Sequence, residues 1–277
     1  MDFAQSPPPH YRGEPLKGKT LHVYWEQGLG DTLQFCRFAA LLAEQGVQVI
    51  LNVQPPLVAL LSSLLPDVEV ISEAPFLRSA DYQVPLLSLP HFLGVRVETL
   101  PKIPHLDSVA SDLKIHGRHR VASVGGTPKI GLVWSGSRAH KNDRNRSIPF
   151  EVIRPILDLP FSFHCLQQEI REEERGTVEA AQSLTCYERL LLDFTDTAAL
   201  ILEMDLVISV DTSVAHLAGV LGKPVWILLP YTPDFRWLLE RADSPWYPSA
   251  RLYRQDLRRE WPSVIQTVVE DLKKKDF

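Results

Sequence analysis

The stretch LHVYWEQGLGDTLQFCRFAALLAE at residues 21–44 decides the class of fold. Its first five residues, Leu21 to Trp25, form an apolar run that is typical of a buried strand. A glycine-rich turn over residues 27–32 follows, and residues 33–44 are apolar almost all round, which predicts a buried helix packed on a sheet. A strand, a turn and a buried helix together form the first part of a βαβ unit.

The same alternation continues through the first half of the chain. Strands are predicted at residues 47–53, 68–71 and 82–84, and a helix is predicted at residues 57–65. Residues 95–128 differ in character, with prolines, scattered histidines and the glycines of Val124-Gly125-Gly126. We interpret the end of this region, near residues 122–128, as a linker between two domains.

The pattern then begins again. Strands are predicted at residues 129–134, 161–166, 190–192, 205–210 and 224–229, the last being the final clear strand. Helices are predicted at residues 149–157, 169–182, 197–204 and 261–274, and another runs from a cap at Asp211 to Gly222. We therefore expect an α/β fold with two Rossmann-like domains, residues 1–124 and 125–277, facing across a cleft. The final helix is a candidate to cross back to the N-terminal domain.

Composition excludes several classes of protein. The 277-residue chain is 45% hydrophobic and carries a formal net charge of -5, so it lacks the overall basic excess of a nucleic-acid-binding protein. No apolar run approaches the roughly 20 residues that span a bilayer, and the first residues lack the apolar core of a signal peptide. We expect a soluble, cytoplasmic protein without a transmembrane segment. Cys36, Cys165 and Cys186 lie far apart in sequence, which favours reduced, buried thiols over a disulfide or a zinc site.

Ligands of open α/β sheets bind at the carboxyl ends of the strands, and the first candidate site lies at such an end. Gly28 and Gly30 let a ligand approach the backbone, and Asp31 is a candidate general base. The alternative is that Asp31 or Thr32 only caps the helix. A dinucleotide-binding fingerprint is disfavoured, because Leu33 stands in place of the third glycine.

Two further candidates follow strands of the second half. Ser135 and Gly136 lead into a loop with basic residues, and its Lys141 and Arg146 suit a diphosphate. The alternative is a solvated surface loop. Gln168 and Glu169, which follow the next predicted strand, could bind a ribose or a base edge, or could simply start a polar helix.

The fourth candidate is Ser209-Val210-Asp211-Thr212-Ser213-Val214-Ala215-His216. A helix N-terminus offers free N–H groups and the positive end of a dipole, which together bind anions. Small side chains at Thr212 and Ser213 leave room for a phosphate, and His216 lies one turn further on. If Asp211 caps the helix it uses donors that a phosphate needs; the alternative is that Asp211 binds a basic side chain.

Together these segments resemble glycosyltransferase family 9, the bacterial heptosyltransferase family of the GT-B fold. The resemblance runs from about Leu21 to the C-terminus, and its most specific parts are Gly30-Asp31 and residues 211–216. The segments KIGLVWSG at residues 129–136 and SPWYP at residues 244–248 are also similar. The chain looks like a subgroup that often follows tetratricopeptide repeats, although no repeats are visible in it.

The resemblance implies roles for individual residues. Asp31 matches the catalytic aspartate, and Arg146 stands where the family usually has a phosphate-binding lysine. Asp211, Thr212, Ser213 and His216 match the loop and helix that hold the donor diphosphate, with Ser213 where glycine is common. Gln168 or Glu169 lies near the position of a ribose-binding acid.

The implied reaction is an inverting, metal-independent transfer of a hexosyl or heptosyl group from a nucleoside-diphosphate sugar. The donor is a co-substrate, and no cofactor or metal is expected, because protein cations take the place of a metal. The acceptor is left open as a saccharide, a lipid-linked or a protein hydroxyl. Two alternatives are a GT-B-type nucleotide-sugar epimerase and an inactive binding or scaffold module.

Overall fold

The computed structural model describes residues 7–73, 79–101 and 126–274. The chain divides into two compact units, one of residues 1–112 with 193–195 and one of residues 113–192 with 196–277. The boundary expected between residues 124 and 125 lies outside the described residues, as does most of the predicted linker.

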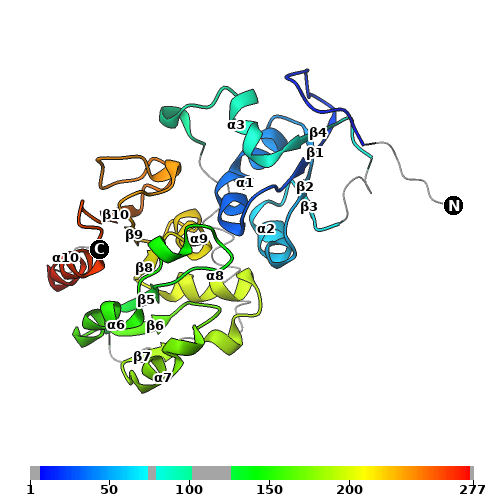
Figure 1. Cartoon of the computed structure of the whole chain (residues 1–277). Helices are drawn as coiled ribbons and strands as arrows, with labels where there is room; N and C mark the ends of the chain where they lie inside the picture. The colour runs from blue at the N-terminus through cyan, green and yellow to red at the C-terminus, as the bar shows by residue number, and fades with distance from the viewer. Residues whose placement is uncertain (1–6, 74–78, 102–125, 275–277) are drawn as a thin grey trace. The chain divides into compact units, whose positions relative to one another are not determined.

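The described residues of the first unit form a parallel sheet of four strands in the order β3-β2-β1-β4 (Figure 1). Its strands are β1 (Thr20–Tyr24), β2 (Gln48–Asn52), β3 (Glu69–Ile71) and β4 (Tyr82–Pro85). Its helices are α1 (Leu29–Glu44), α2 (Val58–Leu64) and α3 (Leu89–Phe92), with short 3-10 turns η1 (Pro55–Leu57), η2 (Leu86–Ser88) and η3 (Val97–Thr99). Helix α1 is the most deeply buried of these, as its apolar sequence predicts.

Helix α1 begins earlier than the sequence pattern indicates. The prediction placed its start at Leu33, but Leu29 is the first helical residue and Gly28 is the N-cap. Gly30 and Asp31 therefore belong to the first helical turn and not to a preceding loop. Asp31 occupies the third helical position, from which a side chain can reach back to the backbone before the helix.

The second unit is a parallel sheet of six strands in the order β10-β9-β8-β5-β6-β7. Its strands are β5 (Lys129–Val133), β6 (Ser162–Cys165), β7 (Leu184–Cys186), β8 (Leu206–Val210), β9 (Val225–Leu229) and β10 (Ala250–Arg254). Strands β8 and β9 are buried along their whole length, which explains why their sequences are continuous apolar runs.

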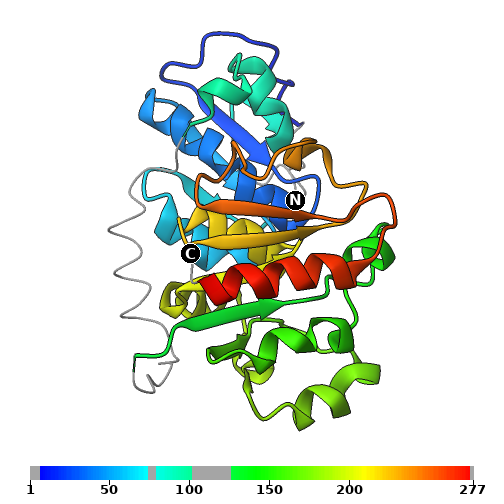
Figure 2. The same cartoon turned by 90° about the vertical axis from the view of Figure 1, so that its left-hand side faces the viewer.

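Helices cover both faces of this sheet (Figures 1 and 2). The helices are α5 (Asp143–Arg146), α6 (Phe150–Ile153), α7 (Glu172–Ala180), α8 (Phe194–Glu203), α9 (Ser213–Val220) and α10 (Trp261–Lys274), with 3-10 turns η4 (Arg154–Asp158), η5 (Glu188–Leu190) and η6 (Phe235–Trp237). One hydrophobic cluster joins the sheet to α6, η4, α7 and α10. Helices α8 and α9 lie on the opposite face, behind the sheet in Figure 2.

Several sequence predictions for the second unit are wrong. Helix α10 belongs to the second unit and not to the first, and it buries Val264, Ile265 and Val268 in the core of the second unit. No strand forms at residues 190–192, where the 3-10 turn η5 ends, and both β7 and β10 were missed. The expectation of three buried thiols is also wrong, because Cys186 is exposed.

Candidate functional site

Both sheets have one point at which the strand order reverses. In the first unit this point lies between β1 and β4, and in the second it lies between β5 and β8. Loops that leave adjacent strands at such a point diverge to opposite faces of the sheet, which opens a crevice for ligands at the carboxyl ends. The segments after β1, β5 and β8 are three of the four candidates from the sequence.

In the second unit, the segment that follows β5 is held by a single glutamine. The Gln167 Oε1 atom accepts hydrogen bonds from the backbone N–H groups of Trp134 and Ser135, both at 2.8 Å. Trp134 is fully buried, and its indole N–H donates to Glu174 at 3.1 Å. This buried scaffold fixes where the following residue, Gly136, presents its backbone.

Arg146 connects the segment after β5 to the segment after β8. Its Nη1 atom donates to the backbone carbonyl of Asp211 at 2.7 Å. The guanidinium also lies against Gly136, where a Cβ atom would stand 2.4 Å from Nη2. A larger residue at position 136 would therefore displace Arg146, which explains the need for glycine there.

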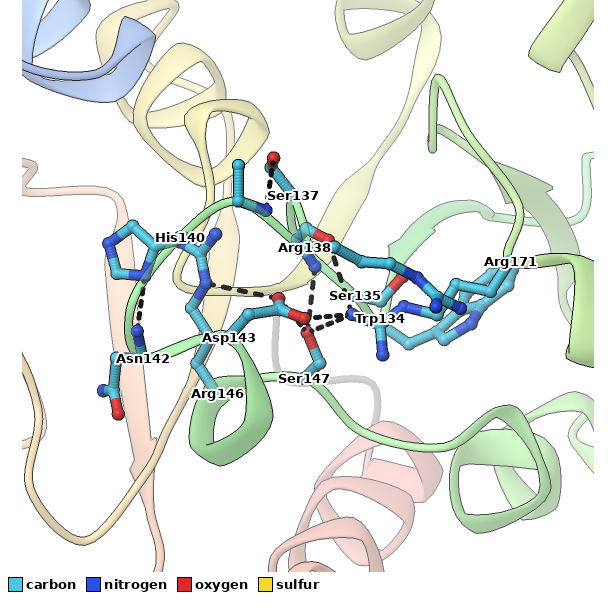
Figure 3. Close-up of polar contacts among 12 residues, drawn as sticks. Trp134, Ser135, Ser137, Arg138, His140, Asn142, Asp143, Arg146, Ser147 and Arg171 are labelled. Atoms are coloured by element: carbon cyan, nitrogen blue, oxygen red, sulfur yellow. Dashed lines mark hydrogen bonds and ion pairs between the residues drawn. The ribbon is translucent and has the colours of Figure 1, made fainter.

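An ion cluster that the sequence analysis missed supports Arg146 (Figure 3). Asp143 is buried and binds Arg171 through Oδ2 and Nη2 at 2.6 Å, and its Oδ1 accepts the Ser147 hydroxyl at 2.7 Å. The Nε atom of Arg146 is 3.8 Å from the same Oδ1 atom. Ser147 also accepts the N–H of Gly136 at 3.1 Å. Burial lowers the pKa of Arg146, while Asp211 and Asp143 oppose that shift.

Helix α9 starts directly after β8 and has no side-chain cap. Thr212 is the N-cap, and its hydroxyl bonds Ser209 at 3.0 Å instead of a helix amide. The prediction that Asp211 caps this helix is therefore wrong, since Asp211 lies one residue before the cap. The first amides of a helix have no intrahelical acceptor, so those of residues 213–215 are donors for a ligand.

The carboxylate of Asp211 faces a buried aromatic group. Its Oδ1 atom is 3.7 Å from His216 Nε2, and His216 Nδ1 shares a hydrogen bond of 2.8 Å with the hydroxyl of Tyr247. The His216 ring stacks on Trp237 with centroids 5.2 Å apart and is buried. Burial raises the pKa of Asp211, and Trp237 and Arg236 partly offset that rise. His216 therefore contacts Asp211 and Tyr247 directly. A contact between His216 and the donor diphosphate stays a prediction.

The remaining predicted residues of this unit lie at the surface. Lys141 is exposed and lines a cavity of about 930 Å³ beside the loop that carries Arg146. Arg171, Tyr231, Gln255 and Arg259 line the same cavity. Gln168 and Glu169 are exposed just after β6, whereas the adjacent Gln167 is the residue that the fold uses. The cavity lies within the size range of small-molecule sites.

In the first unit, Asp31 lies at the start of α1. Its Oδ2 atom accepts the N–H of Gly28 at 2.9 Å, so the capping role considered as the alternative is present. A carboxylate has about four lone-pair sites, and one such bond does not exhaust them. Glu26 lies close by, and burial together with the charge of Asp31 raises the pKa of Glu26. The sequence analysis did not single out this second acid.

Within residues 7–73, 79–101 and 126–274, no group of three or more His, Cys, Asp or Glu side chains is arranged to hold a metal ion. Among the helices of these same residues, none is long and apolar enough to cross a membrane.

Comparison with solved structures defines the class of fold. Escherichia coli heptosyltransferase WaaC, solved with ADP-2-deoxy-2-fluoro heptose, superposes with a TM-score of 0.62 at 12% identity and covers 93% of this chain and 100% of its own. The iron-containing dodecameric glycosyltransferase TibC from enterotoxigenic E. coli H10407 gives a TM-score of 0.60 at 12% identity, with coverages of 94% and 77%. The predicted α/β fold of the GT-B class is confirmed.

Sequence comparison points to the same group of enzymes. A model of glycosyltransferase family 9 (heptosyltransferase) matches residues 165–268, which include β8 and α9. Protein FlbA of Caulobacter vibrioides is 27% identical, over 97% of this chain and 49% of FlbA. This chain thus spans about half the length of that relative. The chain is similar to heptosyltransferase-like glycosyltransferases.

Proposed function

We propose that this chain is an inverting glycosyltransferase that takes a sugar from a nucleoside-diphosphate donor held by its second unit. The single observation that carries the proposal is the contact between Arg146 and the backbone carbonyl of Asp211. This contact brings a fixed positive charge to the uncapped start of α9. Full charge and oriented backbone N–H groups together suit the two phosphates of a nucleoside diphosphate.

In the proposed reaction, the group that most needs stabilisation is the leaving group. As the bond between the anomeric carbon and the diphosphate oxygen breaks, negative charge grows on the departing nucleoside diphosphate. Arg146 and the amides of residues 213–215 would stabilise that charge without rearranging, because the buried Asp143 and Gly136 already hold the guanidinium in place. Lys141, which is exposed at the cavity, would add a further cation.

Asp31 of the first unit is our candidate general base. It would accept the proton of the acceptor hydroxyl while the oxygen of that hydroxyl bonds to the anomeric carbon, in a single displacement with inversion. The bond to the Gly28 N–H fixes the orientation of the carboxylate and leaves acceptor capacity for the proton. Metal independence is part of the proposal, since Arg146 and α9 supply the charge that a metal would supply.

The solved relatives suggest only which nucleotide base and sugar to test first. The WaaC structure holds an ADP sugar analogue, which makes ADP-sugars the first donors to test. The transferred group is hexosyl or heptosyl, and the acceptor is open. We also propose that the protein acts in the bacterial cytoplasm and belongs to the subgroup associated with tetratricopeptide repeats.

The proposal is tested by incubating the purified protein with ADP-, UDP- and GDP-sugars and candidate acceptors, in the presence of EDTA. We expect acceptor-dependent release of one nucleoside diphosphate and a glycosylated product detected by mass spectrometry. Turnover of a nucleotide-sugar without any acceptor would favour the epimerase instead. Binding without turnover across acceptors would favour an inactive binding module.

A further inference from the structure

Cys165 and Cys186 lie side by side although 20 residues separate them in the chain. They are the last residues of the parallel strands β6 and β7, and they are direct partners in the register of that pair. Adjacent strands run about 4.7–4.9 Å apart, which falls within the Cα separation of about 4.4–6.8 Å that a disulfide accepts. Partners in register on parallel strands project their side chains from the same face of the sheet.

The two thiols differ in their access to solvent. Cys165 is fully buried in the hydrophobic cluster of the second unit, which also contains Leu184 at the other end of β7. Cys186 is exposed, because β7 is the edge strand of the sheet. A reagent in solution therefore reaches Cys186 before Cys165.

The environment also separates their chemistry. A hydrogen bond between the two sulfur atoms lowers the pKa of the Cys186 thiol and raises the pKa of the Cys165 thiol. Burial and the nearby carboxylates of Glu188 and Glu179 oppose the lowering at Cys186. The thiolate is the nucleophilic form, so Cys186 is the attacking sulfur and Cys165 is the proton donor beside it.

We propose that Cys165 and Cys186 form a redox pair that closes to a disulfide across β6 and β7 when the protein meets a hydroperoxide. The Cys186 thiolate attacks one peroxide oxygen, the O–O bond breaks, and Cys186 becomes a sulfenic acid as hydroxide leaves. The sulfur of Cys165 then bonds to the sulfur of Cys186, and the sulfenic oxygen leaves as water with the Cys165 proton. Overall, two thiols and one hydrogen peroxide give one disulfide and two waters.

The consequence for the fold is local. The edge strand β7 is three residues long and has β6 as its strand partner. A covalent link to β6 would stabilise the folded state, because it restricts the unfolded chain between the two cysteines. The pair does not depend on glycosyl transfer, so its test is separate from that of the proposed function.

Mass spectrometry of the full chain tests the pair. The protein is treated with hydrogen peroxide, alkylated, and digested without reduction, with Cys36 as the internal control because it is fully buried in the first unit. We expect a linked peptide pair containing Cys165 and Cys186 that dithiothreitol separates, while Cys36 is alkylated only after denaturation. Oxidation of Cys186 to sulfinic or sulfonic acid without linkage, or equal oxidation of Cys36, would overturn the proposal.

Two variants assign the order of the steps. In Cys165→Ser, a dimedone probe should trap sulfenic acid on Cys186, because the resolving thiol is absent. In Cys186→Ser, which changes an exposed edge position, Cys165 should stay reduced under the same peroxide treatment. The thermal midpoint should rise on oxidation of the wild type and stay constant in Cys186→Ser. Trapping at Cys165 in the Cys186→Ser variant would contradict the assigned roles.

Discussion

Helices α1 and α9 occupy equivalent places in their sheets, but the aspartate near each N-terminus has a different position and different contacts. Each follows a strand at the point where its sheet reverses order, each is largely buried, and each has an aspartate near its start. In α1 the aspartate is the third helical residue, and Asp31 turns back to the N–H of Gly28. In α9 the aspartate precedes the N-cap, and Asp211 faces His216 instead of the helix amides.

The difference shows that a shift of a few residues decides whether an aspartate accepts a hydrogen bond from the backbone at the helix start or leaves the helix amides available to a ligand. A carboxylate at the third position consumes one donor of the helix start and repels anions there. An aspartate before the cap leaves the amides available and is itself held by neighbouring groups. We therefore propose acceptor-side proton chemistry for the start of α1 and anion binding for the start of α9, and variants at and around both helix starts test this contrast.

The largest expected effect is on turnover in Asp31→Asn. The amide oxygen can still accept the Gly28 N–H, so stability should be unchanged, but the side chain can no longer take a proton. Loss of a general base should reduce turnover by about 10²–10⁴-fold. Release of nucleoside diphosphate from the preferred donor and a thermal melt measure the two quantities.

Asp31→Ala is the matched control for the capping role. It removes both functions and should also lower the free energy of unfolding by about 0.5–1.5 kcal/mol, the net contribution of one hydrogen bond. If Asp31→Asn turns over donor at the wild-type rate, Asp31 only caps the helix and the assignment fails.

The next effect is on nucleotide affinity in Arg146→Ala. Truncating a buried charged partner costs about 2–5 kcal/mol, which weakens binding by roughly 30-fold to several thousand-fold. Gly136→Ala should have a similar effect, because the new methyl group displaces the guanidinium. Arg189→Ala is the control, since Arg189 is exposed on η5 and does not line the cavity beside Arg146. Titration calorimetry with the preferred nucleotide ranks the variants, and equal loss in Arg189→Ala would indicate a general charge effect.

A smaller effect is expected around His216. His216→Ala should weaken nucleotide binding moderately and less than Arg146→Ala, because His216 is buried behind Asp211. Tyr247→Phe removes one hydrogen bond to His216 and should lower the free energy of unfolding by about 0.5–1.5 kcal/mol. Urea unfolding measures the second value. A loss of affinity in Tyr247→Phe as large as that in Arg146→Ala would mean that the aromatic group, and not Arg146, organises the site.

The smallest expected effect concerns pH. Burial raises the pKa of Asp211 above the ordinary 3.8, so the folded state holds this proton more tightly than the unfolded state does. Its contribution to stability is full below about pH 3.8 and is lost as pH rises through the folded-state pKa. Asp211→Asn should therefore gain stability relative to the wild type across that window in urea titrations. A constant difference at every pH would show that Asp211 is not the titrating group.

Much of the fold follows from local sequence, and the failures have identifiable causes. The buried strands β5, β8 and β9 are continuous apolar runs, so their residues were predicted closely. Strands β7 and β10 were missed because LTC and ARLYR alternate with polar residues at the sheet edges. The cap of α9 was misplaced by one residue, since Asp211 and Thr212 are both good cap residues and the end of β8 decides between them.

The candidate site could be predicted from the sequence only in part. The segments at Asp31, Arg146 and residues 211–216 could be chosen as candidates because polar residues after apolar strands are visible in sequence, and their functional roles stay predictions. The contacts of Arg146 with Asp211 and Gly136 were not, because they depend on the order of strands in the sheet. The pairing of Cys165 with Cys186 depends on register, which no local pattern reveals.

The most direct test of the contrast between the two helix starts is an amide NMR titration with ADP, UDP and GDP. In ¹⁵N-labelled protein, the preferred nucleotide should shift the amide resonances of Ser213, Val214 and Ala215 most strongly, together with the side-chain N–H of Arg146. The amides of Leu29, Gly30 and Asp31 should shift much less, because the carboxylate of Asp31 disfavours an anion there. Larger shifts at the start of α1 than at the start of α9, or no shifts at either helix, would contradict the account.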